Sequence, residues 1–84
     1  EEETAKDWKF LVRVGDSEDK IEYSVILDKV YWQKLTNGQQ EPEKLLRKSF
    51  EFLLEREPKE SILRKFNLRE INRYFPEYEK EIKK

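Results

Sequence analysis

The chain has 84 residues, of which 44% are charged and 36% are hydrophobic, and its 18 basic side chains nearly balance its 19 acidic ones. A chain of this length forms one small domain, so residues 1–84 are expected to share a single core. Cysteine and histidine are both absent, which excludes disulfides, thiolate or imidazole metal sites and any catalysis that uses an imidazole base.

The N-terminal third predicts a β-hairpin. Residues 1–7 are polar and are expected to be flexible. The runs WKFLVRV (8–14) and IEYSVIL (21–27) both alternate between apolar and polar positions and are rich in β-branched and aromatic residues. That pattern is typical of strands, and the polar GDSEDK between them is typical of a turn. We therefore expect residues 8–27 to form an antiparallel hairpin.

Residues 28–84 are expected to be helical. Asp28 can cap the N-terminus of a first short helix, and Asn37–Gly38 can end that helix in a left-handed conformation. Pro42 suits the first turn of a longer helix that should run to about Glu57. Its apolar stripe has helical spacing and consists of Leu45, Leu46, Phe50, Leu53 and Leu54.

Beyond Pro58, a short helix is expected to turn three apolar side chains inward, those of Ile62, Leu63 and Phe66. Asn67 and Glu70 have the spacing of a capping box, which indicates another short helix. The tail either adds one helical turn, held by Tyr78 and Ile82, or frays. The predicted fold is α+β: an N-terminal antiparallel hairpin packed on three to four short helices, in the order ββαααα.

Residues 21–57 resemble the ribbon-helix-helix family of DNA-binding proteins, in which a strand is followed by a short helix and a longer one. The resemblance implies a dimer whose strand pairs with its own copy and turns outward side chains into the major groove. The matching outward positions here are Glu22, Ser24 and Ile26. None of them is an Arg, Lys, Asn or Gln, the residue types that make paired contacts to base edges. The preceding run, 8–14, can also pair with this strand inside one chain.

The C-terminal half, SFEFLLEREPKESILRKFNLREINRYFPEYEKEI, is similar to a group of short bacterial proteins. Those proteins share a leucine-rich helix, an EREPKESIL break and an RYFPEY ending. The resemblance implies a natural bacterial fold and implies no mechanism, because the group has no settled function.

Basic residues gather in the second half of the chain. Residues 1–42 carry 6 basic and 10 acidic side chains, whereas residues 43–84 carry 12 and 9. Any contact with nucleic acid is therefore expected at Arg64, Lys65, Arg69 and Arg73. The isoelectric point is near 5.6, and nucleic-acid-binding domains usually lie above about 9, so nucleic acid is the less favoured partner.

Three aromatic residues are candidates for a protein contact, because Tyr and Trp are common at the centres of binding interfaces. Tyr31 and Trp32 are neighbours on a short helix, so one of them should face outward. Phe52 lies off the apolar stripe of the longer helix. The alternative is that these rings fill a core that has few aliphatic side chains.

These features predict a small non-enzymatic module that binds another protein, with self-association as one form of that binding. The alternative is a regulator or antitoxin of the ribbon-helix-helix type. No cofactor or metal is expected. No membrane partner is expected either, since no apolar run approaches the ~20 residues of a membrane span. The start, EEETAKDWK, is acidic where a signal peptide would be basic, so the cytoplasm is the expected compartment.

Overall fold

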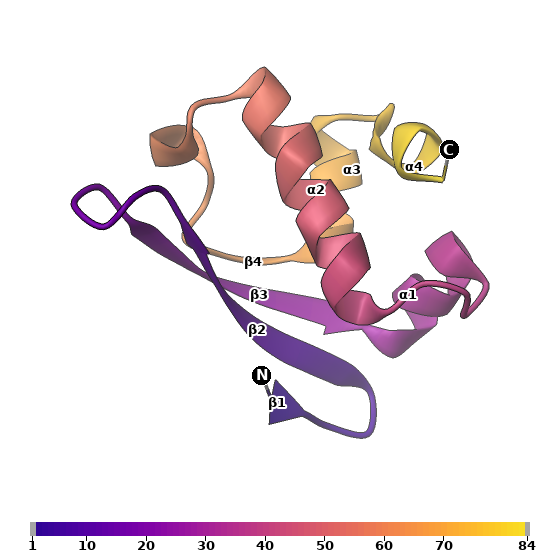
Figure 1. The fold of residues 1–84 in the computed structure, drawn as a ribbon. Coiled ribbons are helices and arrows are strands. Elements are labelled where there is room, and N and C mark those ends of the chain that lie inside the picture. Colours follow the sequence, from indigo (N-terminus) through magenta and orange to yellow (C-terminus); the bar gives the residue numbers. More distant parts are fainter. Residues whose placement is uncertain (1, 84) are drawn as a thin grey trace.

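The computed structural model describes residues 2–83 (Figure 1). Within them, a mixed sheet in the order β1-β2-β3-β4 consists of β1 (Glu2–Glu3), β2 (Asp7–Val14), β3 (Ile21–Asp28) and β4 (Lys65–Asn67). The helices are α1 (Lys29–Thr36), α2 (Pro42–Arg56), α3 (Ile71–Tyr74) and α4 (Tyr78–Ile82), joined by the 3₁₀ turns η1 (Lys59–Ser61) and η2 (Leu68–Glu70). The predicted α+β class is confirmed. None of these helices is long and apolar enough to cross a bilayer.

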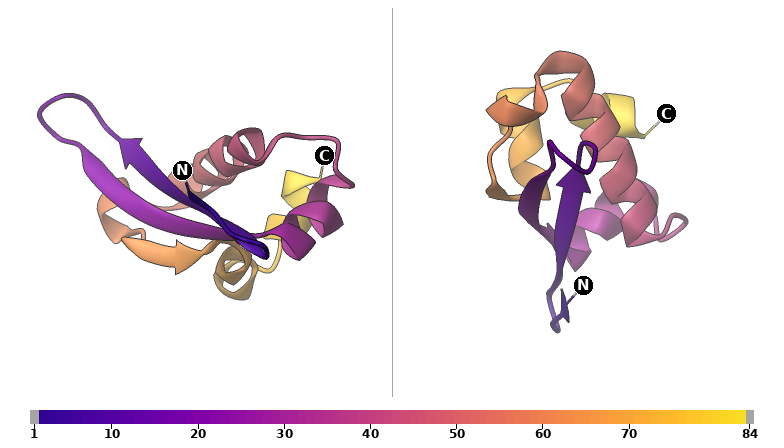
Figure 2. Two further views of the ribbon diagram at one scale, coloured as in Figure 1. Left: turned by 90° about the horizontal axis from the view of Figure 1, so that it is seen from below. Right: turned by 60° about the vertical axis from the view of Figure 1, so that its left-hand side comes forward.

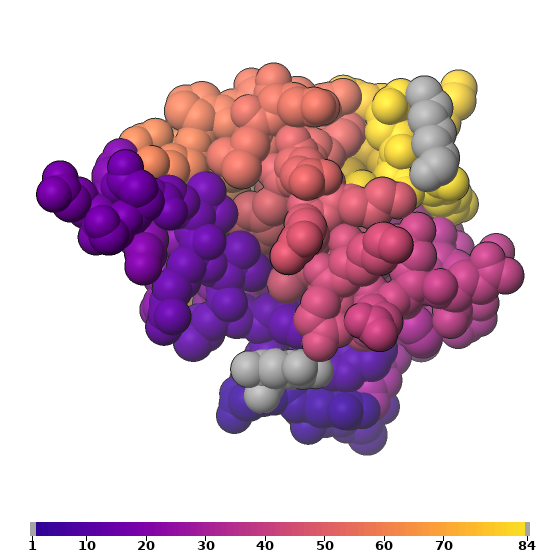
Figure 3. Space-filling view, viewed as in Figure 1, coloured from indigo at the N-terminus to yellow at the C-terminus, as the bar shows by residue number. Residues whose placement is uncertain are grey.

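The predicted hairpin is confirmed. Strands β2 and β3 pair in antiparallel register from Asp7 opposite Asp28 to Val14 opposite Ile21. The loop between them projects from the body of the molecule (Figure 3). Gly15 begins this loop with a φ of 118°, where a Cβ atom would lie 2.0 Å from a main-chain oxygen. The turn therefore requires glycine at this position.

The predicted order ββαααα is wrong, because two more strands extend the hairpin into a sheet. Strand β1 lies within residues 1–7, which were expected to be flexible, and pairs with β2; residue 1 lies outside the described residues. Strand β4 lies within residues 28–84, which were expected to be helical, and pairs in parallel with β3. Neither strand gives a period-two signal, since they are only two and three residues long.

Strand β4 also replaces the short helix that was predicted to follow Pro58. The chain is already extended at Ile62, and the amide of Ser24 on β3 donates to the carbonyl of Arg64 at 2.7 Å. Pairing with the exposed edge of β3 satisfies main-chain groups that a helix would have satisfied internally. Phe66 remains buried as predicted, whereas Leu63 is 52% exposed.

Three of the four predicted helix-end signals are confirmed. Asn37 ends α1 in the left-handed conformation, with a φ of 54°, Pro42 is the first residue of α2, and a capping box begins at Asn67. The Asp28 carboxylate does not cap α1. It accepts a hydrogen bond from the side-chain amide (Nδ2) of Asn67 at 3.3 Å and lies 3.3 Å from the guanidinium of Arg69. Side chains brought close by the fold therefore take the place of the local helix amides as its partners.

Helix α2 lies at the centre of the packing, with the sheet on one side and α4 on the other (Figure 2). Its buried side chains span more than one stripe and are Leu45, Leu46, Ser49, Phe50, Phe52 and Leu53. In the left view of Figure 2 no helix crosses in front of β2 and β3. The helices thus cover one face of the hairpin, and the other face carries exposed residues of β2.

Helix α4 is held by two buried side chains, Tyr78 and Ile82. The Tyr78 hydroxyl lies 2.6 Å from the Ser49 hydroxyl, which in turn donates to the carbonyl of Leu45 at 2.8 Å. Both Tyr78 and Ser49 are fully buried, so these bonds satisfy two polar groups inside the core. Of the two outcomes predicted for the tail, the helical turn is confirmed.

Candidate functional site

The three aromatic residues expected to form a protein contact do not form a free surface. Phe52 is only 6% exposed and Tyr31 only 9%. Trp32 is half-buried, and its indole N–H donates to the carbonyl of Gln40 at 2.8 Å. The expectation of exposure fails for Phe52 because α4 covers the side of α2 that the apolar stripe leaves free, and the ring of Phe52 packs against Tyr78.

Tyr31 joins α1 to α4 through a polar contact. Its hydroxyl donates to the carboxylate of Glu79 at 2.9 Å. Burial of the ring and the hydrogen bond to Glu79 both raise the pKa of Tyr31 above its ordinary value of 10.0. The folded chain therefore holds this proton more tightly than the unfolded chain does.

This shift in the pKa of Tyr31 predicts a loss of stability in alkali. A raised pKa in the folded state gives stability that is complete below the unfolded value of 10.0 and falls as the pH rises above it. Urea unfolding between about pH 8 and pH 11 should therefore show a steeper decline for the wild type than for Tyr31→Phe, which has no hydroxyl to titrate. Parallel declines would contradict the assignment of this effect to Tyr31.

The four basic residues proposed for nucleic acid are all exposed, but the fold brings only two of them to the same hollow. Arg69 and Arg73 line it together with Lys34. Acidic groups accompany two of these cations, since Lys34 lies 3.6 Å from Glu79 and Arg69 pairs with Asp28. Lys65 stands opposite Ser24 in the sheet, and Arg64 lies just before it.

The hollow carries little net positive charge with which to bind the phosphate backbone of a nucleic acid, because Glu70 and Glu79 line it as well. Binding to nucleic acid requires several uncompensated cations along one surface. The arrangement of the cations therefore adds no support for a nucleic-acid interface.

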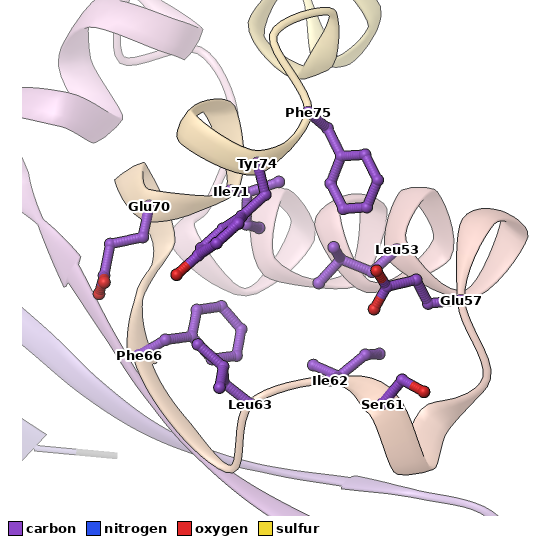
Figure 4. A pocket seen from close by; sticks show the side chains of 10 residues that line it. All are labelled: Leu53, Glu57, Ser61, Ile62, Leu63, Phe66, Glu70, Ile71, Tyr74 and Phe75. Carbon is purple, nitrogen blue, oxygen red and sulfur yellow. The ribbon is translucent and has the colours of Figure 1, made fainter.

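A second hollow lies on the other side of α3 and is mainly apolar (Figure 4). We call it the apolar groove. Its volume is about 210 Å³, and it is lined by Leu53, Glu57, Ser61, Ile62, Leu63, Phe66, Glu70, Ile71, Tyr74 and Phe75. Pro58 follows the end of α2 and β4 returns the chain toward α3, so three successive segments within residues 53–75 enclose this space.

The groove has a buried floor and an exposed rim. Four of its apolar side chains are less than a tenth exposed: Leu53, Ile62, Phe66 and Ile71. Leu63 and Tyr74 at the rim are 52% and 62% exposed. Large apolar side chains beside a concave apolar surface are typical of places where proteins bind one another.

The two charged residues that line the groove are both acidic. Figure 4 shows Glu70 at one end and Glu57 at the other, with the apolar side chains between them. One oxygen of Glu70 already accepts a hydrogen bond from the main-chain N–H of Asn67 at 2.7 Å. Within residues 2–83, the carboxylate of Glu57 has no hydrogen bond or ion pair, so it can accept one from a bound group.

Hydrogen bonds account for the clear pKa shifts of carboxyl groups among the described residues. The carboxyl groups whose pKa values shift clearly are Glu3, Asp16 and Glu77, and hydrogen bonds lower the pKa in each case. Residues 2–83 also contain no group of three or more carboxylates placed to hold a metal ion.

Comparison of the chain with family models, with curated proteins and with solved structures gave no match. The two resemblances drawn from the sequence therefore stay predictions.

Sequence reasoning missed the groove because it placed Ile62, Leu63 and Phe66 on one face of a helix. In the extended chain Leu63 faces solvent instead, whereas Ile62 and Phe66 are buried. The polar, apolar and polar order of Lys65, Phe66 and Asn67 is too short to have indicated β4.

Proposed function

We propose that this chain is a cytoplasmic, non-enzymatic binding module that takes an apolar segment of another protein into the apolar groove. The observation that carries the proposal is the pairing of a buried apolar floor with two exposed apolar side chains, Leu63 and Tyr74, at its rim. Exposed apolar side chains beside a hollow lose more contact with water on binding than isolated ones do.

The size of the groove favours side chains of a protein over a free small molecule. Its volume is about 210 Å³, whereas small-molecule sites usually hold about 300–1,000 Å³. A space of this size accommodates one or two side chains of a peptide. Tyr74 offers both an apolar ring and a hydroxyl at the rim, a combination common at the centres of protein interfaces.

The charge of the groove favours a segment that carries basic residues. Glu57 and Glu70 mark its two ends, and none of the described residues that line it carries a positive charge. Lysine or arginine beside the apolar residues of the partner would face these carboxylates, which adds specificity and speeds association. The expected ligand is therefore an apolar segment flanked by Lys or Arg.

A random peptide library displayed on phage tests this proposal. Selection on the wild-type chain should enrich sequences with an apolar centre and basic flanks. The enriched peptides should bind at least about tenfold more weakly to Tyr74→Ala or Leu63→Ser, because each variant removes a large contact surface at the rim. Glu57→Gln should weaken binding less and reduce its dependence on salt.

The control is Leu11→Ser, since Leu11 is also 62% exposed but lies on β2, away from the groove. Its affinity for the enriched peptides should equal that of the wild type. The proposal fails if no peptide is enriched, or if the enriched peptides bind Tyr74→Ala and Leu63→Ser as tightly as they bind the wild type.

The alternative of a ribbon-helix-helix regulator gains no support from the sheet. That family needs the edge of its strand free for a second copy of the same strand. Here β3 lies between β2 and β4, so both of its edges are already paired over Ser24–Ile26. A single chain therefore occupies the edge that the dimer would use.

A further inference from the structure

The apolar groove and the exposed side chains beside it belong to one surface. Five large apolar side chains among the described residues are at least 40% exposed, and two of them, Leu63 and Tyr74, lie at the rim of the groove. Figure 4 shows these two on opposite sides of the groove. The surface therefore offers both a hollow that can receive an apolar side chain and apolar side chains that can enter a hollow.

Two cations stand next to the rim without an acidic partner. Arg64 follows Leu63, Arg73 precedes Tyr74, and both arginines are exposed. Within residues 2–83, neither guanidinium makes an ion pair or a hydrogen bond, whereas nearby Arg69 pairs inside the chain. Arg64 and Arg73 are therefore available to the acidic groups of a bound partner.

The groove supplies the opposite charge. Its two lining carboxylates, those of Glu57 and Glu70, lie at its two ends, and that of Glu57 has no partner within residues 2–83. The ligand that suits this groove is an apolar side chain with Lys or Arg beside it. The rim of the groove carries that combination twice, so the surface is complementary to a second copy of itself.

We infer that two copies of this chain bind each other groove to groove, each placing the Leu63 and Tyr74 side chains of its rim into the groove of the other. The inference rests on the proposed function, because it names a second copy as the partner of the same groove. The acids lie at the ends of the groove and the cations beside its rim, so copies that cross about a two-fold axis bring opposite charges together. Since both copies use the same surface, the association stops at the dimer.

Other exposed apolar side chains suit the groove less well. Leu11 lies on β2 near Arg13, whose guanidinium already pairs with Glu22 at 3.0 Å. Val30 follows Lys29, which is likewise paired inside the chain. Binding through either side chain would join the groove to a different surface, and contacts of that kind give open-ended chains or rings instead of a two-fold dimer.

Exchange of charge between two variants tests the contact. Arg64→Glu/Arg73→Glu replaces both cations and Glu57→Lys replaces one acid, so each variant brings like charges together in its own dimer. Sedimentation equilibrium should show a reversible dimer of the wild type and a dissociation constant at least about tenfold higher for each variant. An equimolar mixture of the two variants should associate more tightly than either alone, because opposite charges then meet.

Leu11→Ser is the matched control and should dimerise as the wild type does, whereas Leu63→Ser and Tyr74→Ala should dimerise more weakly. Circular dichroism should show that all the variants are folded. A wild-type monomer at all concentrations, growth beyond the dimer, or a dimer that Leu11→Ser weakens would overturn the inference. A mixture of the charge variants that associates no better than its components would overturn it as well.

Peptide binding separates failure of this inference from failure of the proposed function. Arg64 and Arg73 do not line the groove, so Arg64→Glu/Arg73→Glu should bind the enriched peptides no more weakly than the wild type does. A wild-type chain that binds these peptides but stays monomeric would overturn the dimer alone. A dimer with the expected response to charge, but without any enriched peptide, would overturn the binding of other proteins and leave the second copy as the partner of the groove.

Discussion

Replacing Phe52 with alanine should destabilise the fold by about 3–5 kcal/mol, the usual effect of removing a buried phenylalanine. The ring is 6% exposed and lies 5.2 Å from the ring of Tyr78 and 5.9 Å from that of Phe75. The Arg56 guanidinium covers it, with its central carbon 3.6 Å from the ring centre. Urea unfolding followed by circular dichroism measures the change.

Leu54→Ala on the same helix is the control for Phe52→Ala. Leu54 is 40% exposed, so its truncation should have a much smaller effect. A surface substitution usually changes stability by no more than about 0.5 kcal/mol. An effect that small for Phe52→Ala would mean that the ring lies at the surface, where the sequence alone places it.

Tyr78→Ala should be comparably severe, at about 3–5 kcal/mol, because it empties the space that a fully buried ring fills between α4 and α2. Tyr78→Phe should lose only about 0.5–1.5 kcal/mol. The phenylalanine keeps the ring, and Ser49 keeps its hydrogen bond to the carbonyl of Leu45. The same urea titrations compare the two variants.

This pair of variants tests whether α4 is docked in solution. A small folded domain has a total stability of about 5–15 kcal/mol, so the loss of Tyr78 would be a large part of it. If Tyr78→Ala left stability within about 0.5 kcal/mol of the wild type, the tail would be frayed rather than packed. Phe52 and Tyr78 are in contact, so their combined effect should fall short of the sum of the two.

The parts of the fold that sequence reasoning predicted are those set by neighbours in the chain. The hairpin follows from two alternating runs and a polar turn. The ends of α1 and α2 follow from the conformations that Asn37 and Pro42 favour. The capping box at Asn67 depends on a residue three positions further on. Each of these signals lies in or next to the element that it specifies.

The parts that it missed depend on partners distant in the sequence. Strand β4 exists because β3 offers an edge, and nothing in its three residues requires an extended chain by itself. Phe52 is buried because α4 packs on α2, which makes α2 apolar on more than one side. The Asp28 carboxylate contacts Asn67 and Arg69 instead of capping α1. Tertiary contacts outweigh local preference in all three places.

The apolar groove was beyond prediction for the same reason. Its residues were recognised as apolar, but its shape requires the chain to pass from α2 through η1 to β4 and then to α3. A helix through Ile62 and Phe66 would have buried Leu63 along with them. The extended path leaves that leucine exposed at the rim.

The parallel pairing of β3 with β4 also has a consequence for synthesis of the chain. Residues 29–64 separate the two strands, so β3 emerges from the ribosome before its second neighbour does. Until residue 67 follows, the nascent hairpin presents an uncovered strand edge beside the apolar face of Tyr23, Val25 and Leu27. Edges of this kind capture strands of other chains. The chain is therefore most exposed to aggregation before β4 docks, and residues 65–67 are what end that exposure.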